Sequence, residues 1–397
     1  MRPRVTLERG HVQPVWAGHP WVYAQAVARV EGGARGGDEV EVVDPRGNFL
    51  GRGFYTPSSA IAVRIVTRDA DEALDAAFFR ERIARAHLRR RDLGLPNAET
   101  TAYRLVHAEG DGLPGLVVDV FGDVCVVQMT TLGMKQREGL LLAAIEEVIA
   151  PRAIIDRSPA EMARHEGFTP ATGVVRGDES RTTLEFVERG LRFSIPPELA
   201  QKTGFYFDQR PLRARVEQLA RGRRVLDAYA FVGSFALGAA RGGATEVVAV
   251  DESAIAIEVG AAAARANHLD ANVRFVREDA RVALARAGRE GTYDLVVCDP
   301  PKLSPTRAAR NDALGAYRRL AADGCSATAP GGILVLCSCS AAVGIDALVR
   351  ALALGARDAG RGAIVLERHF QGADHPVPAA FPEGLYLKSV IARVDRP

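Results

Sequence analysis

Short apolar stretches separated by turn sequences dominate the first 70 residues of the chain. EVEVVD (39–44), FLGRGFY (49–55) and AIAVRIVT (60–67) are rich in β-branched and aromatic residues. Segments such as PRGN and TPSS separate them, as expected of strands joined by turns. The pattern predicts a small β-barrel over residues 1–70.

Helical and extended patterns mix in the middle of the chain. Apolar residues recur at helical spacing over 75–96, with Phe78, Phe79 and Ile83 on one face. The opposite face is rich in arginine: Arg80, Arg82, Arg85, Arg89, Arg90 and Arg91. Such a face fits either a solvated surface or a phosphate contact. With extended patterns in 104–129 and 171–195, this region predicts an α+β domain over residues 72–185.

Apolar strands alternate with helical stretches from about residue 190 onward. Five segments have the composition of buried strands: RVLDAYA (224–230), EVVAVD (246–251), VRFVRED (273–279), DLVVCDPP (294–301) and GGILVLCSCS (331–340). This alternation favours a doubly wound, mostly parallel sheet. The fold class is therefore predicted to be α/β, with this sheet over residues 190–397.

Composition places the chain among ordinary soluble proteins. Of its 397 residues, 47% are hydrophobic and 25% are charged, and the net charge is only +2. No apolar run reaches the roughly 18 residues of a membrane span, and the N-terminus lacks the apolar core of a signal peptide. The five cysteines form no zinc-type CxxC pair, and the eight histidines show no metal spacing. We therefore expect a cytoplasmic protein with no metal and no membrane contact.

Acidic residues follow three successive strands of the predicted sheet. Asp227, Asp251 and Asp279 end these strands, and Gly233 opens the helix after the first. Ligands of doubly wound sheets bind beyond the carboxyl ends of the strands, where an acid can accept hydrogen bonds from ribose hydroxyls. Each aspartate alone is equally well explained as a helix cap. Together the three acids indicate a nucleoside-bearing cofactor.

The fourth strand ends in Asp-Pro-Pro-Lys, residues 299–302. Two prolines fix φ and hold a rigid loop just past the strand. Such a loop, with a carboxylate and free carbonyls, can line a planar base; the simpler alternative is an ordinary turn.

At these residues the chain resembles class I S-adenosylmethionine-dependent methyltransferases, which share this order of acids and the DPPK loop. Four further motifs resemble one subgroup, the PUA-domain-containing large-subunit (23S) ribosomal RNA cytosine-5 methyltransferases. They are QKTGFYFDQR (201–210), GHPWVYAQAV (18–27), EGDGLPGLVVDVFGD (109–123) and DHPVPAAFPEGLYLK (374–388). The glycine loop departs from the family pattern, since Val232 and Ser234 replace a glycine and a threonine.

The resemblance implies three parts. Residues 1–70 would be a PUA-like RNA-binding barrel, 72–185 the family's central α+β domain, and 190–397 the Rossmann-like methyltransferase sheet with a final antiparallel strand. It implies S-adenosylmethionine as methyl donor and large-subunit ribosomal RNA as partner, and it leaves a homodimer open. The cofactor-binding residues would be Asp227, Gly233, Asp251, Asp279 and Asp299.

Two cysteines, Cys337 and Cys339, lie at the end of the fifth strand. Carbon 5 of cytosine is a poor nucleophile, and a thiolate that adds to carbon 6 makes it able to accept a methyl group. Cys339 is nearer the mouth of the site, and the resemblance places the family's catalytic cysteine there. Cys337 is expected to pack in the core. Taken alone, CSCS is better explained as a small-residue strand end with buried thiols, and its pairing with the DPPK loop favours the catalytic interpretation.

The remaining candidates would contact the substrate. Asp299 is expected to bind the base edge at nitrogen 3 or the exocyclic amine. The other substrate-binding candidates are Lys202, Phe205, Tyr206, Arg210, Pro300, Pro301 and Lys302. Core packing is an equal alternative for the two aromatic residues.

Two other functions stay open. A guanine or adenine nitrogen methyltransferase could use the same DPPK loop, but its chemistry needs no thiol, so Cys339 favours the cytosine-5 reaction. A non-catalytic RNA-binding protein would have no need of Asp227, Asp251, Asp279 and Asp299 together.

Overall fold

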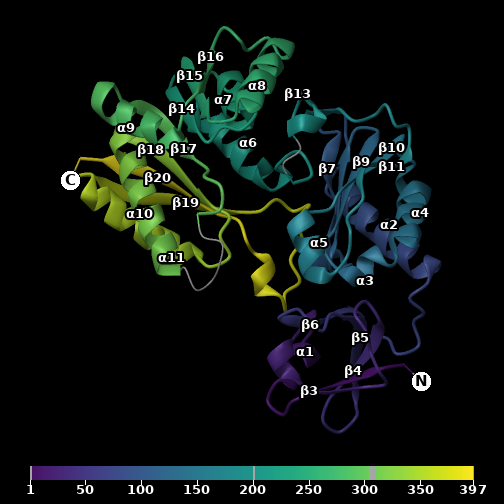
Figure 1. Cartoon of the computed structure of the whole chain (residues 1–397). Coiled ribbons are helices and arrows are strands. Elements are labelled where there is room, and N and C mark those ends of the chain that lie inside the picture. Colours follow the sequence, from purple (N-terminus) through teal and green to yellow (C-terminus); the bar gives the residue numbers. More distant parts are fainter. Residues whose placement is uncertain (1, 200–201, 304–309, 397) are drawn as a thin grey trace. The chain divides into compact units, whose positions relative to one another are not determined.

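The chain folds into two compact units, each built from several segments (Figure 1). The computed structural model describes residues 2–199, 202–303 and 310–396. The first unit comprises Met1–Gly190, Ile195–Phe207 and Ala373–Gly384, and the second comprises Leu191–Ser194, Asp208–Gly372 and Leu385–Pro397. The chain thus returns to the first unit for a short segment near its end.

A six-stranded sheet in the order β2-β6-β5-β4-β1-β3 occupies the N-terminal 70 residues (Figure 1, purple). Its elements are β1 (Arg4–Leu7), α1 (Val12–Trp16), β2 (Trp21–Tyr23), β3 (Val27–Glu31), β4 (Glu39–Val43), β5 (Phe49–Tyr55) and β6 (Ile61–Thr67). Alternate residues of the strands point inward, so Val40, Val42 and Val63 are fully buried. The predicted β-rich start of the chain is confirmed.

A five-stranded sheet in the order β11-β10-β9-β8-β7 follows in the same unit. Its strands are β7 (Ala102–His107), β8 (Leu116–Phe121), β9 (Val124–Met129), β10 (Ala153–Arg157) and β11 (Thr172–Gly177). The helices of this region are α2 (Ala76–Asp92), α3 (Leu132–Lys135), α4 (Glu138–Ile149) and α5 (Ala160–Glu166). Two short strands come next along the chain, β12 (Leu184–Glu188) and β13 (Leu191–Ile195).

Helix α2 shows how the local sequence sets an element. The Asp75 side chain accepts a hydrogen bond from the Phe78 backbone N–H at 3.1 Å and caps its start. Phe79 and Ile83 are fully buried, as their spacing predicts, and each contributes about 1.5–3 kcal/mol by leaving water. The assignment of Arg90 to the exposed face is wrong. It follows Phe79 and Ile83 at helical spacing and is only 1% exposed, because it is paired with Asp111.

A seven-stranded sheet forms the second unit, in the order β16-β15-β14-β17-β18-β20-β19. Its strands are β14 (Arg224–Ala228), β15 (Glu246–Asp251), β16 (Val273–Arg277), β17 (Tyr293–Cys298), β18 (Thr328–Ser338), β19 (Gly362–Phe370) and β20 (Lys388–Asp395). β14 to β18 are mutually parallel, and β20 is antiparallel to both of its neighbours. The doubly wound sheet and its final antiparallel strand are therefore confirmed.

Within the described residues, six helices pack around this sheet. They are α6 (Arg210–Leu219), α7 (Ser234–Arg241), α8 (Ala254–Ala266), α9 (Ala280–Glu290), α10 (Arg310–Ala327) and α11 (Ile345–Asp358). Helix α10 packs against α9 and α11, and α6 packs against α7. The strands between them read as near-continuous apolar runs because both faces of a parallel sheet are covered. In the part of the chain that the structure describes, no helix is long and apolar enough to cross a bilayer.

Candidate active site

The strand order reverses direction between β14 and β17. From β14 the chain adds β15 and β16 on one side, then crosses to add β17 and β18 on the other. Ligands of doubly wound sheets bind at such a switch point. Asp227 lies at the end of β14, and Asp299 follows β17 directly. Because Ala228 pairs with Cys298, the two aspartates lie at neighbouring strand ends. The switch point thus brings together two of the predicted site residues.

The Asp227 carboxyl group is fully buried, and its two oxygens differ in their hydrogen bonding. One carboxyl oxygen accepts a hydrogen bond from the Ala236 backbone N–H at 3.0 Å. The other has no hydrogen-bond partner among the described residues. Burial, with a smaller contribution from the nearby charges of Asp299 and Asp251, raises the pKa of this carboxyl to about 8. An unpartnered carboxyl oxygen among three acids fits a cationic ligand group.

The loop after β14 is tightly wound. Tyr229, Phe231 and Gly233 have positive φ values of 67°, 52° and 73°, a conformation that costs energy for residues other than glycine. The Asp251 carboxylate accepts hydrogen bonds from the backbone N–H groups of Phe231 at 2.8 Å and Ser253 at 2.9 Å. Asp251 therefore fixes this loop, and its other lone pairs stay suited to a ribose.

Gly233 is required by packing as well as by its φ. A Cβ atom at this position would lie 2.6 Å from the ring of Phe275 on β16. No side chain can be accommodated there without moving that ring. Packing against Phe275 is therefore sufficient to explain the glycine. The prediction that the cofactor approaches the backbone here stays a prediction.

Asp279 caps helix α9, the alternative explanation that its sequence position left open. It accepts from the Arg281 backbone N–H at 2.7 Å and pairs with the Arg281 guanidinium at 2.7 Å. Hydrogen bonding to Arg281 lowers the pKa of Asp279 to about 2. Because β16 neighbours β15, this carboxylate, two residues after the end of β16, follows the strand next to the one that Asp251 ends.

Asp299 has a partner that the sequence did not reveal. The side-chain amide of Gln209 donates a hydrogen bond to its carboxylate at 3.0 Å. Gln209 is buried and also interacts with the Cys337 thiol. It belongs to the QKTGFYFDQR motif, but only the folded chain brings it to the end of β17.

The two cysteines of CSCS differ in exposure. Cys337 is the second-last residue of β18 and is fully buried opposite Ser389. Burial and the Asp299 charge raise the pKa of its thiol well above the usual value. Cys339 follows the end of β18 and is partly exposed, whereas the other four cysteines of the chain are all buried. Cys298, to which no role was assigned, is among the buried ones.

Lys388 was missed as a site residue. It is the first residue of β20, lies opposite Ser338 and is only 4% exposed. Its ammonium donates hydrogen bonds to the carbonyl oxygens of Ser340 and Tyr386, both at 2.7 Å. Burial lowers its pKa to about 8, and an interaction with Cys339 opposes that shift. The sequence separates Lys388 from Ser340, the residue after Cys339, by 48 positions, so only strand pairing shows their proximity.

The DPPK loop offers one buried and two exposed positions. Pro300 is buried against the sheet end, whereas Pro301 and Lys302 are exposed. The loop runs on into residues 304–309, which lie outside the described part of the chain.

The QKTGFYFDQR motif is divided between the two units. Its residues 202–207 belong to the first unit and residues 208–210 to the second. Phe205 is buried, with its ring 5.0 Å from that of Phe186 and 5.3 Å from that of Phe207. This favours the core alternative for Phe205 over base stacking. Arg210 begins α6 and is half-buried, and Gln201 lies outside the described residues.

Lys202 lies at a cavity of the first unit. The Lys202 ammonium is 4.6 Å from the centre of the half-buried Tyr206 ring. The cavity has a volume of about 560 Å³ and is also lined by Gln128, Asp156, Arg157 and Ser158 at the ends of β9 and β10. Its lining holds two cations, Arg157 and Lys202, which suit a phosphate-bearing ligand, beside one carboxylate, Asp156.

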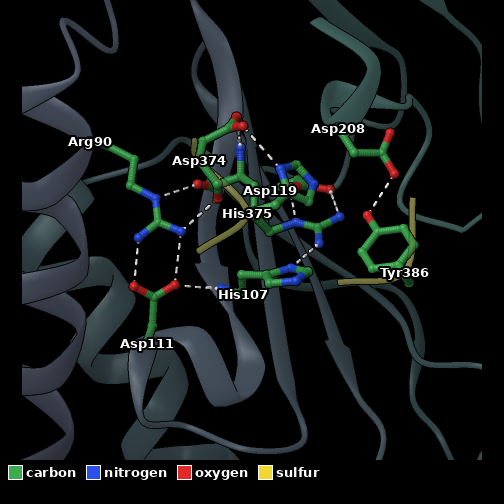
Figure 2. Close-up of polar contacts among 9 residues, drawn as sticks. Arg90, His107, Asp111, Asp119, Asp208, Asp374, His375 and Tyr386 are labelled. Carbon is green, nitrogen blue, oxygen red and sulfur yellow. Dashed lines mark hydrogen bonds and ion pairs between the residues drawn. The ribbon is translucent and has the colours of Figure 1, made fainter. Parts of the chain in front are cut away.

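Two of the family-like motifs meet inside the first unit (Figure 2). Asp111, from EGDGLPGLVVDVFGD, accepts two hydrogen bonds from Arg90 at 2.6 and 2.8 Å. Arg90 also donates to the carbonyl oxygen of Asp374, from DHPVPAAFPEGLYLK, and the Asp374 carboxylate lies 2.9 Å from His375. Burial lowers the pKa of the neighbouring His107 well below its usual value. Asp111, Arg90 and Asp374 thus form an internal network of the first unit, whereas Lys388, the last residue of the second motif, belongs to the second unit.

The described residues contain no cluster of three or more His, Cys, Asp or Glu side chains that could hold a metal ion. The polar groups at the switch point are carboxylates, an amide, a thiol and one ammonium. They suit an organic, cation-bearing cofactor and a hydrogen-bonding substrate.

Comparison with protein families gives two matches. Residues 5–68 match a PUA-like domain, and residues 105–379 match an S-adenosylmethionine-dependent methyltransferase. A curated relative from Klebsiella pneumoniae subsp. pneumoniae, named ribosomal RNA large subunit methyltransferase I, is 36% identical over 394 residues, 99% of this chain and 98% of the relative. A relative of the same name from Shewanella amazonensis is 37% identical, over 99% of this chain and 100% of its own length.

Solved structures share the fold. A Streptococcus mutans chain described as an S-adenosylmethionine-dependent methyltransferase is similar with a TM-score of 0.83 at 19% identity, covering 98% of this chain and 99% of that one. A second methyltransferase structure, complexed with SAH, is similar with a TM-score of 0.85 at 20% identity and the same coverage.

Proposed function

The chain belongs to the family of S-adenosylmethionine-dependent methyltransferases that carry an N-terminal PUA-like domain, and from this premise we propose that it methylates carbon 5 of a cytosine in large-subunit (23S) ribosomal RNA. The substrate class follows from the relatives, which are named ribosomal RNA large subunit methyltransferase I. The cytosine-5 reaction rests on one observation. Cys339, the one cysteine that is not buried, lies at the carboxyl end of β18, beside the strand that ends in Asp299.

Cys339 acts as the nucleophile. Its thiolate forms a bond to carbon 6 of the cytosine, and the electrons of the 5,6 double bond move toward nitrogen 3. Carbon 5 thereby becomes nucleophilic. When bound, S-adenosylmethionine supplies the electrophilic methyl group that carbon 5 accepts. The carbon-5 proton passes to water, the double bond re-forms, and the thiolate leaves carbon 6.

Asp299 and Gln209 hold the base edge. The Gln209 amide donates to the Asp299 carboxylate at 3.0 Å and so fixes its orientation. A fixed carboxyl group at this position hydrogen-bonds to nitrogen 3 or to the exocyclic amine, where charge develops during addition. The DPPK loop, with Pro300 and Pro301, lines the base, and Lys302 contacts the RNA backbone.

Asp227, Gly233, Asp251 and Asp279 hold the cofactor. The unpartnered oxygen of Asp227 fits the cofactor's positively charged amino-acid end. The Asp251 and Asp279 carboxylates, which end neighbouring strands, fit the ribose and the adenine amino group.

The first unit binds the RNA. Its PUA-like sheet and the cavity formed by Arg157 and Lys202 offer cations and hydrogen-bond donors to a single-stranded or flipped-out region. Tyr206, which is half-buried, stays a candidate for base stacking, and Arg210 for the substrate entrance.

The direct test is methylation of ribosomal RNA from a strain that lacks this gene. Radiolabelled S-adenosylmethionine and mass spectrometry identify the modified nucleoside. Wild type should yield 5-methylcytidine, Cys339→Ala should lose activity by at least 10³-fold, and Cys337→Ala, the matched control in the same strand end, should retain most of it. A methylated purine, or full activity of Cys339→Ala, would contradict the cytosine-5 reaction and favour nitrogen methylation.

A further inference from the structure

Strand β20 carries a buried cation to the edge where the candidate nucleophile lies. Its antiparallel pairing with β18 places Lys388 opposite Ser338, one residue before Cys339. The ammonium donates to the carbonyl oxygen of Ser340, one residue after Cys339, at 2.7 Å. The ammonium of Lys388 thereby holds the chain just after this cysteine, and its own position is fixed by a second bond to the Tyr386 carbonyl at 2.7 Å.

The charge of Lys388 is incompletely compensated. The side chain is 4% exposed, and burying an ammonium is costly unless an anion faces it. Both of its hydrogen-bond acceptors are neutral carbonyl oxygens, and no carboxylate lies within 4.0 Å of it among the described residues. An ammonium has three donors, and these two bonds use two of them. One donor of the ammonium is thus left for a further acceptor.

We propose that Lys388 is the positioning residue that holds Cys339 as a thiolate, by supplying a buried positive charge beside its sulfur and by fixing the chain at the next residue, Ser340. The proposal rests on the proposed function, because it concerns the nucleophile named there. It assigns a role in the reaction to a residue of the C-terminal strand.

The surrounding groups otherwise oppose a thiolate. Asp299 from the β17 loop, Cys337 from β18 and Tyr317 from α10 share this region. The Asp299 charge raises the pKa of the Cys337 thiol, and burial raises the pKa of the Tyr317 phenol, so that both stay neutral. Lys388 and Cys339 stabilise each other's charged forms, since the interaction that raises the pKa of Lys388 must equally lower that of the thiol.

This arrangement gives a pH window. A thiolate needs a pH above the pKa of Cys339, whereas its partner stays charged only below the pKa of Lys388, which burial lowers to about 8. The ion pair is therefore complete between these two values and weakens as the pH rises through about 8. An arginine at position 388 would keep its charge throughout and remove the upper limit.

The test measures the thiol itself. The other four cysteines are buried, so iodoacetamide should alkylate Cys339 first in the folded enzyme, and intact-mass spectrometry gives the rate. Alkylation rates from pH 5 to 10 report the thiol pKa in wild type, Lys388→Met and Lys388→Arg. Arg393→Met, which removes an exposed cation from the far end of the same strand, is the matched control.

The wild-type thiol should titrate below the about 8.5 of a free cysteine. In Lys388→Met its pKa should rise by at least about one unit, which makes alkylation near pH 7 about 10-fold slower. Lys388→Arg should keep the low pKa, and Arg393→Met should match wild type. Equal thiol pKa values in wild type and Lys388→Met would overturn the proposal.

The proposal can be tested even if Lys388→Met does not fold or the methylation assay fails. If Lys388→Met does not fold, Lys388→Arg still decides, because an arginine stays charged across the pH series and should keep the thiol pKa as low as in wild type or lower it further. A thiol pKa at the free-cysteine value in both proteins would also overturn the proposal. The alkylation readout is independent of which base is methylated, so a failed cytosine-5 assay leaves this test standing, and a failed thiol test leaves the nucleoside analysis standing.

Discussion

At the scale of single residues, the site is a group of acids whose ionisation is set by burial. Three acids surround the switch point, and the one at its centre, Asp227, is fully buried with one oxygen unpartnered among the described residues. The sequence predicted this aspartate from its place at a strand end. It could not predict the raised pKa, because burial and neighbours are set by long-range packing.

Asp227 should make the stability of the cofactor-free enzyme pH-dependent. Its pKa of about 8 in the folded state lies above the roughly 3.9 of an unfolded aspartate, so the folded state binds the proton more tightly. The resulting stabilisation is full below about pH 4 and is lost as the pH rises through about 8. Urea unfolding should show a loss of a few kcal/mol between pH 5 and 8, with about 5 kcal/mol as the ceiling.

Asp227→Asn is the matched variant for this measurement. The amide cannot ionise, so its unfolding free energy should lack this decline, while its affinity for S-adenosylmethionine should fall at least 10-fold. The same pH dependence in variant and wild type would refute the assignment of the raised pKa to Asp227.

The prediction of substrate residues was less complete at this scale. Cys339 and Asp299 were identified from motif and strand position, and they stay candidates. Gln209 and Lys388 were missed because their roles depend on contacts with residues 90 and 48 positions away. Phe205 was left between stacking and packing, and its aromatic neighbours Phe186 and Phe207 favour packing.

At the scale of elements, strand ends and their loops decide the chemistry. The five parallel strands were predicted from apolar runs, since a sheet covered on both faces needs them. The carboxyl ends of β14, β15, β16, β17 and β18 therefore lie along one edge, with the acids and the CSCS segment beside each other in the order of the sheet. The start of β20 enters the same edge because it runs the opposite way.

The loop before α7 tolerates no side chain at position 233. Gly233→Ala should lower the unfolding free energy of the enzyme by about 1–3 kcal/mol, because alanine is strained at a φ of 73° and its Cβ would lie 2.6 Å from the Phe275 ring. Gly315→Ala, within helix α10 and 3.5 Å from a flexible Arg319 side chain, should instead stabilise it by up to about 1 kcal/mol. Denaturant unfolding compares the two, and equal effects would contradict the packing account of Gly233.

At the scale of the whole molecule, two motifs that are far apart in the sequence contact each other through Arg90. The sequence grouped EGDGLPGLVVDVFGD and DHPVPAAFPEGLYLK only by family resemblance. In the structure they meet in the first unit, where Arg90, Asp111 and Asp374 tie the returning segment Ala373–Gly384 to helix α2 (Figure 2). The apolar periodicity of the sequence could not predict this contact, because it placed Arg90 on the exposed face of helix α2.

Breaking this network should loosen the first unit specifically. Asp111→Ala leaves the buried Arg90 without its carboxylate, and removing one partner of a buried pair costs about 3–5 kcal/mol. Hydrogen exchange should increase in α2 and in the segment Ala373–Gly384. Glu147→Ala, which breaks the exposed pair with Arg80, should change stability by less than about 1 kcal/mol. Unchanged exchange in Asp111→Ala would contradict a tethering role.

The central claim is that Cys339 attacks the base, and trapping the adduct tests it most directly. Large-subunit ribosomal RNA transcribed with 5-fluorocytidine carries a fluorine where the proton must leave, so the thiol cannot be released after methyl transfer. After incubation with S-adenosylmethionine, nuclease and protease digestion, mass spectrometry locates the modified peptide. We predict a methylated fluorocytidine on Cys339 and none on Cys337. An enzyme that methylates the unmodified RNA yet carries no adduct, or carries it on another residue, would contradict the account.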